Sequence, residues 1–383
     1  MPIWGSLGEG AEDNVVDRRP QNDNGTDDDD AHDRENPMNS TGNMAPNRPT
    51  IRDVAALSRS SLKTVSRVIN GESGVSSELE QRVKSAIADL GYRHNLSASN
   101  LRRTDRKTAT IGVLLENVAN PFFAAVLGSI ENIARAHGSV VFAGSLNEDS
   151  QREHELFEAF STRRVDGLII APTGGDQSYL ARELAAGTAV VFIDRPPNML
   201  DADSVVTNNF EGARAGVQHL IDVGHRRIAV LGDRTEIATA QLRQAGAIQA
   251  LADAGLDPLP DLIRFDLSNS EQAEEATCRL FDGEPPTAIF AAQNLVTIGA
   301  IRALRRLDLQ RTVALVGFDD FLLADLLDPP ITVIAQSPAT IGRIAAETLF
   351  ARLNGDQSPS RHHVVTTQLI TRGSGEIPPS RSR

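Results

Sequence analysis

The chain is poor in the residues and runs that mark several common classes of protein. It has one cysteine, Cys278, which excludes an intramolecular disulfide framework and suits a reducing compartment. It has no apolar run long enough to cross a bilayer and no basic-then-apolar signal pattern at its start. We therefore expect a cytoplasmic protein that has no membrane partner.

Motifs that carry catalysis or bind cofactors are also missing. There is no GxxxxGK[ST] phosphate loop, no GxGxxG behind a strand, no HExxH and no GxSxG. The run from Thr173 to Asp176, TGGD, reads as a plain turn after a strand. His362 and His363 are adjacent, so on a strand they would point to opposite faces and would not share a metal. The sequence therefore predicts no enzyme, no cofactor and no metal site.

Charge is distributed unevenly along the chain, whose net charge is −13. Residues 1–48 hold eleven acidic residues and four arginines, whereas residues 49–103 hold nine basic and five acidic residues. We expect 1–48 to be a disordered acidic tail because apolar groups are scarce there. The run from Asp27 to Asp30 either competes with a nucleic acid for the basic segment or is simply solvated, and Met38 and Met44 leave a later start open.

The basic segment begins with TIRDVAALSRSSLKTVSRVIN, residues 50–70, which predicts two short helices separated by a tight turn. Thr50 suits the first helix as an N-cap, and Val54, Ala55 and Leu57 can face inward. The second helix buries Val65, Val68 and Ile69 and turns hydroxyl and basic groups outward. A helix-turn-helix of this kind suits the DNA major groove, and the alternative is an ordinary helical hairpin with a solvated face.

A third helix and a short linker complete the segment. Leu79, Val83, Ala86, Ile87 and Leu90 form one apolar stripe, and Gly91 follows as a C-cap. Together with residues 50–70, the run through Val75-Ser76, Leu90-Gly91-Tyr92 and 92–103 resembles the DNA-binding head and hinge of the LacI/GalR repressor family. The resemblance continues almost to the C-terminus.

The resemblance implies a role for individual side chains on double-stranded DNA. Base-reading positions fall on Leu62, Lys63 and Arg67, and an arginine fork matches guanine in the major groove. The phosphate-contacting positions are Thr50, Ser61, Thr64, Ser66 and Asn70. For Thr64 and Ser66 the alternative is plain helix surface or local bonding. In the hinge, Leu101 with Ala98 beside it matches a minor-groove wedge, and the alternative is a linker with an incidental leucine.

The turn between the first two helices departs from the family pattern. Relatives usually have Ala-Gly-Val-Ser where this chain has Ser58-Arg59-Ser60-Ser61. The change removes an easy left-handed position and an apolar contact, so we expect a head that is less stable or has an altered turn.

From Thr108 onward, short strands rich in Val, Ile and Leu alternate with amphipathic helices. The predicted strands are 109–115, 139–144, 165–171, 189–194, 227–232, 287–292, 313–320 and 331–335. Helices such as 122–136, 210–223, 239–254 and 294–306 lie between them. Continuous apolar strands of this kind suit parallel sheets that are covered on both faces. The fold class is therefore an α/β core of two doubly wound parallel-sheet lobes, type I periplasmic-binding-protein-like by the resemblance, with a small all-α helix-turn-helix N-terminal domain.

The resemblance sets the predicted boundaries, because the chain then crosses between lobes near Val206-Thr207, Ala335-Gln336 and Leu369. The domains are 1–48 tail, 49–94 head, 95–107 hinge and linker, 108–206 plus 336–368 N-lobe, 207–335 plus 369–375 C-lobe, and 376–383 loose C-terminus.

A ligand of such sheets binds outside the carboxyl ends of the strands. By resemblance the cleft is lined by Asn120, Phe122, Phe123, Asp194, Arg195, Thr207, Thr239, Arg243, Asn294 and Gln336. One of Phe122 and Phe123 is expected to belong to the core, and Arg243 has a surface ion pair as its alternative. Relatives usually have Asp in place of Thr207 and Asn-Asp in place of Gln293-Asn294, so we expect a less cationic ligand, such as a sugar acid or phosphorylated sugar.

The sequence thus predicts a repressor that binds a palindromic operator as a homodimer and responds to a small effector, a sugar or sugar derivative. The main alternative is a solute-binding receptor with the same core; an enzyme is the third reading, for which no residues stand out.

Overall fold

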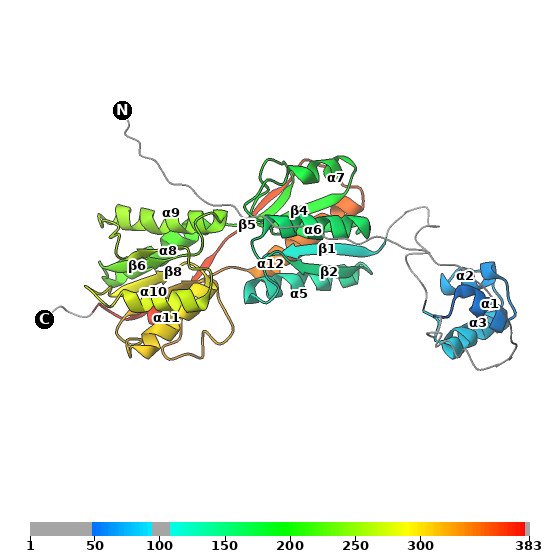
Figure 1. The fold of residues 1–383 in the computed structure, drawn as a ribbon, viewed down its shortest axis with the longest axis horizontal. Coiled ribbons are helices and arrows are strands. Elements are labelled where there is room, and N and C mark those ends of the chain that lie inside the picture. Colours follow the sequence, from blue (N-terminus) through cyan, green and yellow to red (C-terminus); the bar gives the residue numbers. More distant parts are fainter. Residues whose placement is uncertain (1–47, 94–107, 380–383) are drawn as a thin grey trace, which may run out of the picture. The chain divides into compact units, whose positions relative to one another are not determined.

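The structure is a computed structural model that describes residues 48–93 and 108–379. These residues fall into two units, a head up to residue 93 and a core from residue 108 (Figure 1). Most of the predicted acidic tail, the hinge with Ala98 and Leu101, and residues 380–383 lie outside the described residues. Within the described residues, no helix has both the length and the apolar character needed to cross a membrane.

The head consists of α1 (Ile51–Leu57), α2 (Leu62–Ile69) and α3 (Ser77–Leu90). The Asp53 carboxylate accepts hydrogen bonds from the Thr50 backbone N–H at 2.7 Å and the Thr50 hydroxyl at 2.8 Å, which fixes the start of α1. Gly91 ends α3 in the left-handed conformation, with φ +58°.

A small apolar core holds the three helices of the head together. Its buried members are Val54, Ala55, Val65, Val83 and Ala86, and Val68 and Ile69 pack against them. The predicted inward position of Leu57 is wrong. Its side chain is 51% exposed, because Leu57 occupies the last turn of a seven-residue helix beyond the reach of this core.

The unusual turn between α1 and α2 is closed by serine hydroxyls. Ser58 is buried, and its Oγ donates to the Val54 carbonyl at 2.7 Å and lies 2.8 Å from the Ser60 Oγ. Arg59 adopts φ +48°, which is the left-handed conformation that glycine reaches without a steric penalty. Arg59 therefore occupies a left-handed position that strains a residue with a side chain.

Replacing Arg59 with glycine should stabilise the head by about 0.5–1 kcal/mol, because the left-handed strain is relieved while some chain entropy is lost. Slower hydrogen exchange of the α1 and α2 amides in the full chain would measure this. Arg52→Gly is the matched control: Arg52 lies within α1, so glycine there should speed exchange. Faster exchange in Arg59→Gly would contradict the prediction.

The first lobe of the core is one six-stranded sheet with the strand order β11-β5-β4-β3-β1-β2, all pairs parallel. Its strands are β1 (Thr110–Leu115), β2 (Val140–Ser145), β3 (Gly167–Ile170), β4 (Ala189–Asp194), β5 (Asp203–Thr207) and β11 (His362–Val365). One face is covered by α5 (Pro121–Ala136) and α12 (Pro338–Leu353). The other face is covered by α6 (Ser150–Thr162) and the segment containing η1 (Ser178–Leu180) and α7 (Ala181–Ala185).

The second lobe repeats this plan with the strand order β12-β10-β9-β8-β6-β7. Its strands are β6 (Ile228–Leu231), β7 (Ile263–Arg264), β8 (Ala288–Ala291), β9 (Ala314–Phe318), β10 (Thr332–Ala335) and the antiparallel edge strand β12 (Gln368–Ile370). The helices α10 (Ser270–Arg279) and α11 (Asn294–Arg306) cover one face. The helices α8 (Asn209–Val223) and α9 (Ala238–Asp253) cover the other, and η2 (Ser374–Glu376) follows β12. The predicted fold class is confirmed.

The chain passes between the two sheets three times. It does so between β5 and α8, between β10 and α12, and between β11 and β12. Each lobe is therefore built from segments that are distant in the sequence, and the parallel strands of both sheets direct their carboxyl ends toward the space between the lobes.

Candidate functional site

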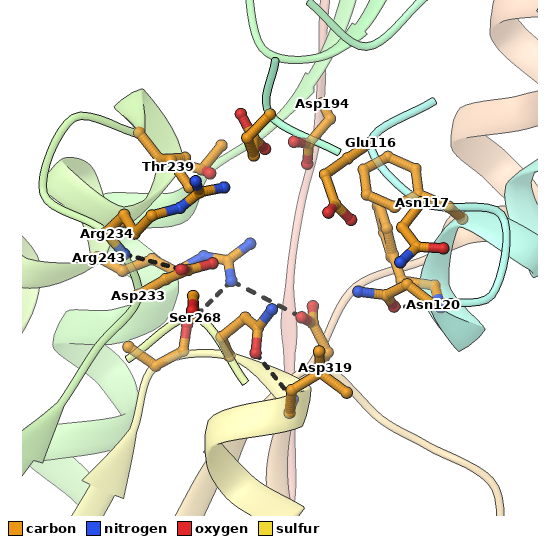
Figure 2. A pocket seen from close by; sticks show the side chains of 18 of the residues that line it. Glu116, Asn117, Asn120, Asp194, Asp233, Arg234, Thr239, Arg243, Ser268 and Asp319 are labelled. Atoms are coloured by element: carbon orange, nitrogen blue, oxygen red, sulfur yellow. Dashed lines mark hydrogen bonds and ion pairs between the residues drawn. The ribbon is translucent and has the colours of Figure 1, made fainter. Parts of the chain in front are cut away.

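A cavity of about 250 Å³ lies at the carboxyl ends of the strands, with walls from both lobes (Figure 2). Eight of the predicted residues line it: Asn120, Phe122, Phe123, Asp194, Arg195, Thr239, Arg243 and Gln336. Thr207 and Asn294 do not line it. Both lie behind lining residues and act on them through hydrogen bonds.

Asn120 links the start of α5 to the second lobe. Its Oδ1 caps α5 by accepting from the Phe122 N–H at 3.1 Å and also accepts from the Asn294 Nδ2 at 2.8 Å. Phe122 and Phe123 pack edge to face with ring centroids 5.0 Å apart. Both are buried in the lobe core and both line the cavity, so the expected division between core and cleft does not hold.

Arg243 is fixed in the wall of the second lobe rather than on the surface. Its Nε donates to the Asn209 Oδ1 at 2.7 Å, and its Nη1 donates to the Ala292 carbonyl at 2.9 Å. The guanidinium carbon lies 3.9 Å from the centre of the Phe318 ring, and Nη1 lies 3.7 Å from the Asp319 carboxylate. The alternative of a surface ion pair is therefore excluded.

Gln336 connects that wall to a crossing between the lobes. Its Nε2 donates to the Asp319 Oδ1 at 2.6 Å, and its Oε1 accepts the hydroxyl hydrogen of Thr207. Thr207 therefore orients Gln336, which lines the cavity.

Arg195 is held by carboxylates of the first lobe. Its guanidinium pairs with both oxygens of Glu148, and its Nη1 also donates to the Pro172 carbonyl at 3.0 Å. Its Nε lies 3.4 Å from the Asp194 carboxylate. Burial raises the pKa of Asp194, and the nearby Arg195 and Arg243 oppose that shift.

Four acidic residues of the cavity were missed by the sequence prediction: Glu116, Glu148, Asp233 and Asp319. Glu116 and Asp319 follow β1 and β9 directly, and Asp233 lies two residues after β6. Asp194 was predicted from the family resemblance, but a search for polar residues at the carboxyl ends of the strands could have found these three. The four missed residues and Asp194 give the cavity five carboxylates, against the guanidinium groups of Arg195, Arg234 and Arg243. The expected shift toward an anionic ligand therefore has no support in this lining.

Burial raises the pKa of Glu116 to about 7, and the negative charges of Glu148, Asp233 and Asp194 add to the effect while Arg195 opposes it. The folded protein thus binds this proton more tightly than the unfolded chain does. The contribution of Glu116 to stability is full below pH 4.5, the ordinary value, and is lost as the pH rises through 7.

Glu116→Gln should therefore stabilise the empty protein at pH 8 by about 1–2 kcal/mol, a figure discounted for the solvent that still reaches the side chain. At pH 4.5 the variant and the parent should melt together. Thermal unfolding at both pH values measures the difference. Glu158→Gln on the exposed side of α6 is the control; a pH-independent offset in Glu116→Gln would contradict the assignment.

On the head, α2 presents its polar face. Ser61, Leu62 and Lys63 are exposed, and Ser66 and Arg67 are half-buried. The Ser61 Oγ caps α2 by accepting from the Thr64 N–H at 3.1 Å, and the Thr64 hydroxyl bonds to it at 2.9 Å. The local bonding considered for Thr64 is therefore present.

Glu72 gathers two of the predicted DNA-contacting side chains. Arg67 Nε lies 3.5 Å from the Glu72 carboxylate, and Arg67 Nη2 donates to the Ser73 carbonyl at 2.9 Å. Asn70 Nδ2 also donates to Glu72, at 3.1 Å. Glu72 therefore holds both side chains close to the end of α2.

Removing that charge with Glu72→Gln should raise the affinity of the protein for random duplex DNA about two- to fivefold at low salt, because Arg67 loses a competing anion. Fluorescence anisotropy over a salt series measures the change. The control is Glu80→Gln, which removes the same charge from α3, where Glu80 pairs with Lys84. If both variants gain the same DNA affinity, the cause is the change in net charge and not the release of Arg67.

Comparison with known proteins matches the head and the core separately. Residues 50–95 match the family described as "Bacterial regulatory proteins, lacI family", and residues 217–375 match "Periplasmic binding protein-like domain". The chain is 30% identical over 331 residues to a ribose operon repressor of Haemophilus influenzae, covering 85% of this chain and 98% of the relative. It is 29% identical, with the same coverage, to the HTH-type transcriptional repressor PurR of Aliivibrio salmonicida.

Solved structures of similar architecture include the Lac repressor dimer bound to operator and the anti-inducer ONPF. That chain has a TM-score of 0.75 and 26% identity, over 86% of this chain and 99% of that one. A complex of the transcriptional regulator CelR with cellobiose has a TM-score of 0.62 and 30% identity, over 85% and 100% of the two chains.

Proposed function

The chain belongs to the LacI family of bacterial regulatory proteins, and from that membership we propose a cytoplasmic repressor whose grip on a palindromic operator is set by a sugar or sugar derivative. The observation that carries the proposal is the cavity between the lobes, with the rings of Phe122 and Phe123 on the wall of the first lobe and polar groups on the walls of both. Such a lining suits a small polyhydroxylated ring.

Control by the effector needs two lobe arrangements that bind it differently. Asn120 on the first lobe and Arg243 on the second both border the cavity, so a ligand that contacts both favours one spacing of the lobes. Because the head precedes the first lobe in the chain, a shift in that lobe is passed to the DNA-binding unit through residues 95–107. Only the difference in affinity between the two arrangements drives the switch.

In this proposal α2 enters the major groove. Leu62, Lys63 and Arg67 read base edges, while Thr50, Ser61, Thr64, Ser66 and Asn70 position the head on phosphates. The hinge residues Ala98 and Leu101 act from the minor groove. The exposure of Leu62 and Lys63 supports this assignment.

A homodimer is part of the proposal, because a palindromic site presents two equal half-sites. The loop after β9 exposes three leucines, Leu322 at 83%, Leu326 at 73% and Leu323 at 54%. The edge strand β2 exposes Val140 and Phe142. Exposed apolar groups clustered in this way are typical of a subunit interface.

Footprinting across the promoter of the protein's own gene, with and without candidate sugars, tests the function. We expect a protected segment with two-fold symmetry whose protection changes with one of the sugars. Binding that shows no preference for any fragment over random duplex, at any salt concentration, would end the proposal.

A further inference from the structure

The charges of the cavity do not balance. Two of its three guanidinium groups are already engaged, Arg195 with Glu148 and Asp194 and Arg243 with Asp319. The third, Arg234, makes a distant ion pair, at 3.9 Å, with Glu236. An excess of carboxylate therefore faces the space that the effector is proposed to fill.

Glu116 and Asp233 carry this excess from opposite walls. Glu116 follows β1 in the first lobe, and Asp233 lies after β6 in the second (Figure 2). Within the described part of the chain, the Glu116 carboxylate has no hydrogen-bond or ion-pair partner. The Asp233 carboxylate accepts one hydrogen bond, from the Arg234 N–H at 2.7 Å. Burial raises the pKa of both residues, and the negative charge of Asp233 raises that of Glu116 further, so the two carboxylates repel each other when both are ionised.

Asp194 adds an independent observation at the same place. It is 6% exposed, borders the cavity, and accepts no hydrogen bond from the residues that the structure describes. Its sole partner there is the Arg195 Nε at 3.4 Å. Burying a carboxylate without hydrogen-bond donors costs free energy. A ligand that donates a hydrogen bond to Asp194 would therefore be bound favourably.

An ammonium group supplies hydrogen-bond donors, whereas a metal ion needs converging ligands. Among residues 48–93 and 108–379, no group of three His, Cys, Asp or Glu side chains is placed to hold a metal ion. An ammonium group needs no such convergence, because its three N–H bonds point to separate acceptors at hydrogen-bond distance.

We infer that the effector carries a primary ammonium group that lies between Glu116 and Asp233, within reach of Asp194. Combined with the proposed function, on which this inference rests, the effector class becomes an amino sugar. The ammonium removes the repulsion between the two walls and bonds to both of them, so it favours the closed arrangement of the lobes. The charge of the ligand thus contributes directly to the switch.

Calorimetric titration at pH 7, in a buffer free of amines, tests the inference. The probes are D-glucosamine, D-galactosamine and D-mannosamine, each beside its parent sugar and its N-acetyl derivative, which keeps the ring and removes the charge. We expect at least one amine to bind about tenfold or more tightly than both of its neutral counterparts. In Glu116→Gln that ratio should fall below about threefold, whereas the control Glu158→Gln should keep it.

Equal or tighter binding by the neutral members, or no binding by any of the three amines, would overturn the inference. So would a ratio that survives in Glu116→Gln. Failure of the proposed function is recognised separately, from the footprint without any sugar. If neutral sugars relieve a sequence-specific footprint, the proposed repressor function stands and the inference of an ammonium-bearing effector is rejected.

Discussion

Replacing Arg243 with methionine is expected to lower the free energy of unfolding of the core by about 3–5 kcal/mol. Methionine replaces the aliphatic part of the arginine side chain but removes both hydrogen bonds, to Asn209 and to the Ala292 carbonyl. It also leaves Asp319 in a buried wall without its cationic neighbour. Breaking a buried pair from one side has an effect of this size, because the remaining charge is uncompensated.

Denaturant unfolding of the full chain measures the change. Arg214→Met is the matched control, since Arg214 lies on the surface of α8 and pairs with Asp253; its loss should cost less than about 1 kcal/mol. Adding Asp319→Asn to Arg243→Met should recover part of the loss by removing the stranded charge. If the double variant is no more stable than the single one, the stranded charge is not the cause.

Placing aspartate at Leu322 and Leu326 together is expected to convert the protein to monomers at micromolar concentration. Each substitution puts a charge on an exposed apolar loop, and two copies of the pair would face each other across the proposed interface. Operator affinity should fall about a hundredfold or more, because two linked heads act at a high effective concentration and single heads do not.

Analytical ultracentrifugation and operator titration measure these two effects. Met199→Asp serves as the control, because Met199 is as exposed as the leucines but lies between β4 and β5, which β1 and β3 separate from the edge strand β2. A doubly substituted protein that still sediments as a dimer would assign the interface to another surface.

Strand prediction succeeded where the chain is continuously apolar and failed where burial depends on polar partners. All eight strands expected from Val, Ile and Leu runs are present. The missed strand β5 begins with Asp203 and Ser204, which are buried. Their burial is possible because Arg352 binds Asp203 with two nitrogen atoms, at 2.7 and 2.9 Å, and His362 pairs with Ser204 at 2.9 Å. Such partners, about 150 residues away, are not visible in a local pattern.

Most lining residues of the site were predicted, but the contacts that only the folded chain creates were not. Asn120 and Asp194 were predicted from the family resemblance, and topology agrees with that prediction, because a helix start and a strand end both lie at the cleft. Asn294 was misplaced because its amide turns toward Asn120 rather than the cavity, which is decided by a contact between lobes. The excess of carboxylate went unnoticed because Glu116 and Asp233 lie more than a hundred positions apart and meet only in the folded chain.

The triple passage of the backbone between the sheets has a mechanical consequence. Two bodies joined by three short tethers are hindered from separating, while a swing of one body about the tethers remains easy. A small displacement at the cavity is then magnified with distance from the tethers. The largest travel falls at the outer ends of the lobes, so an effector of a few ångströms can move surfaces that it never touches.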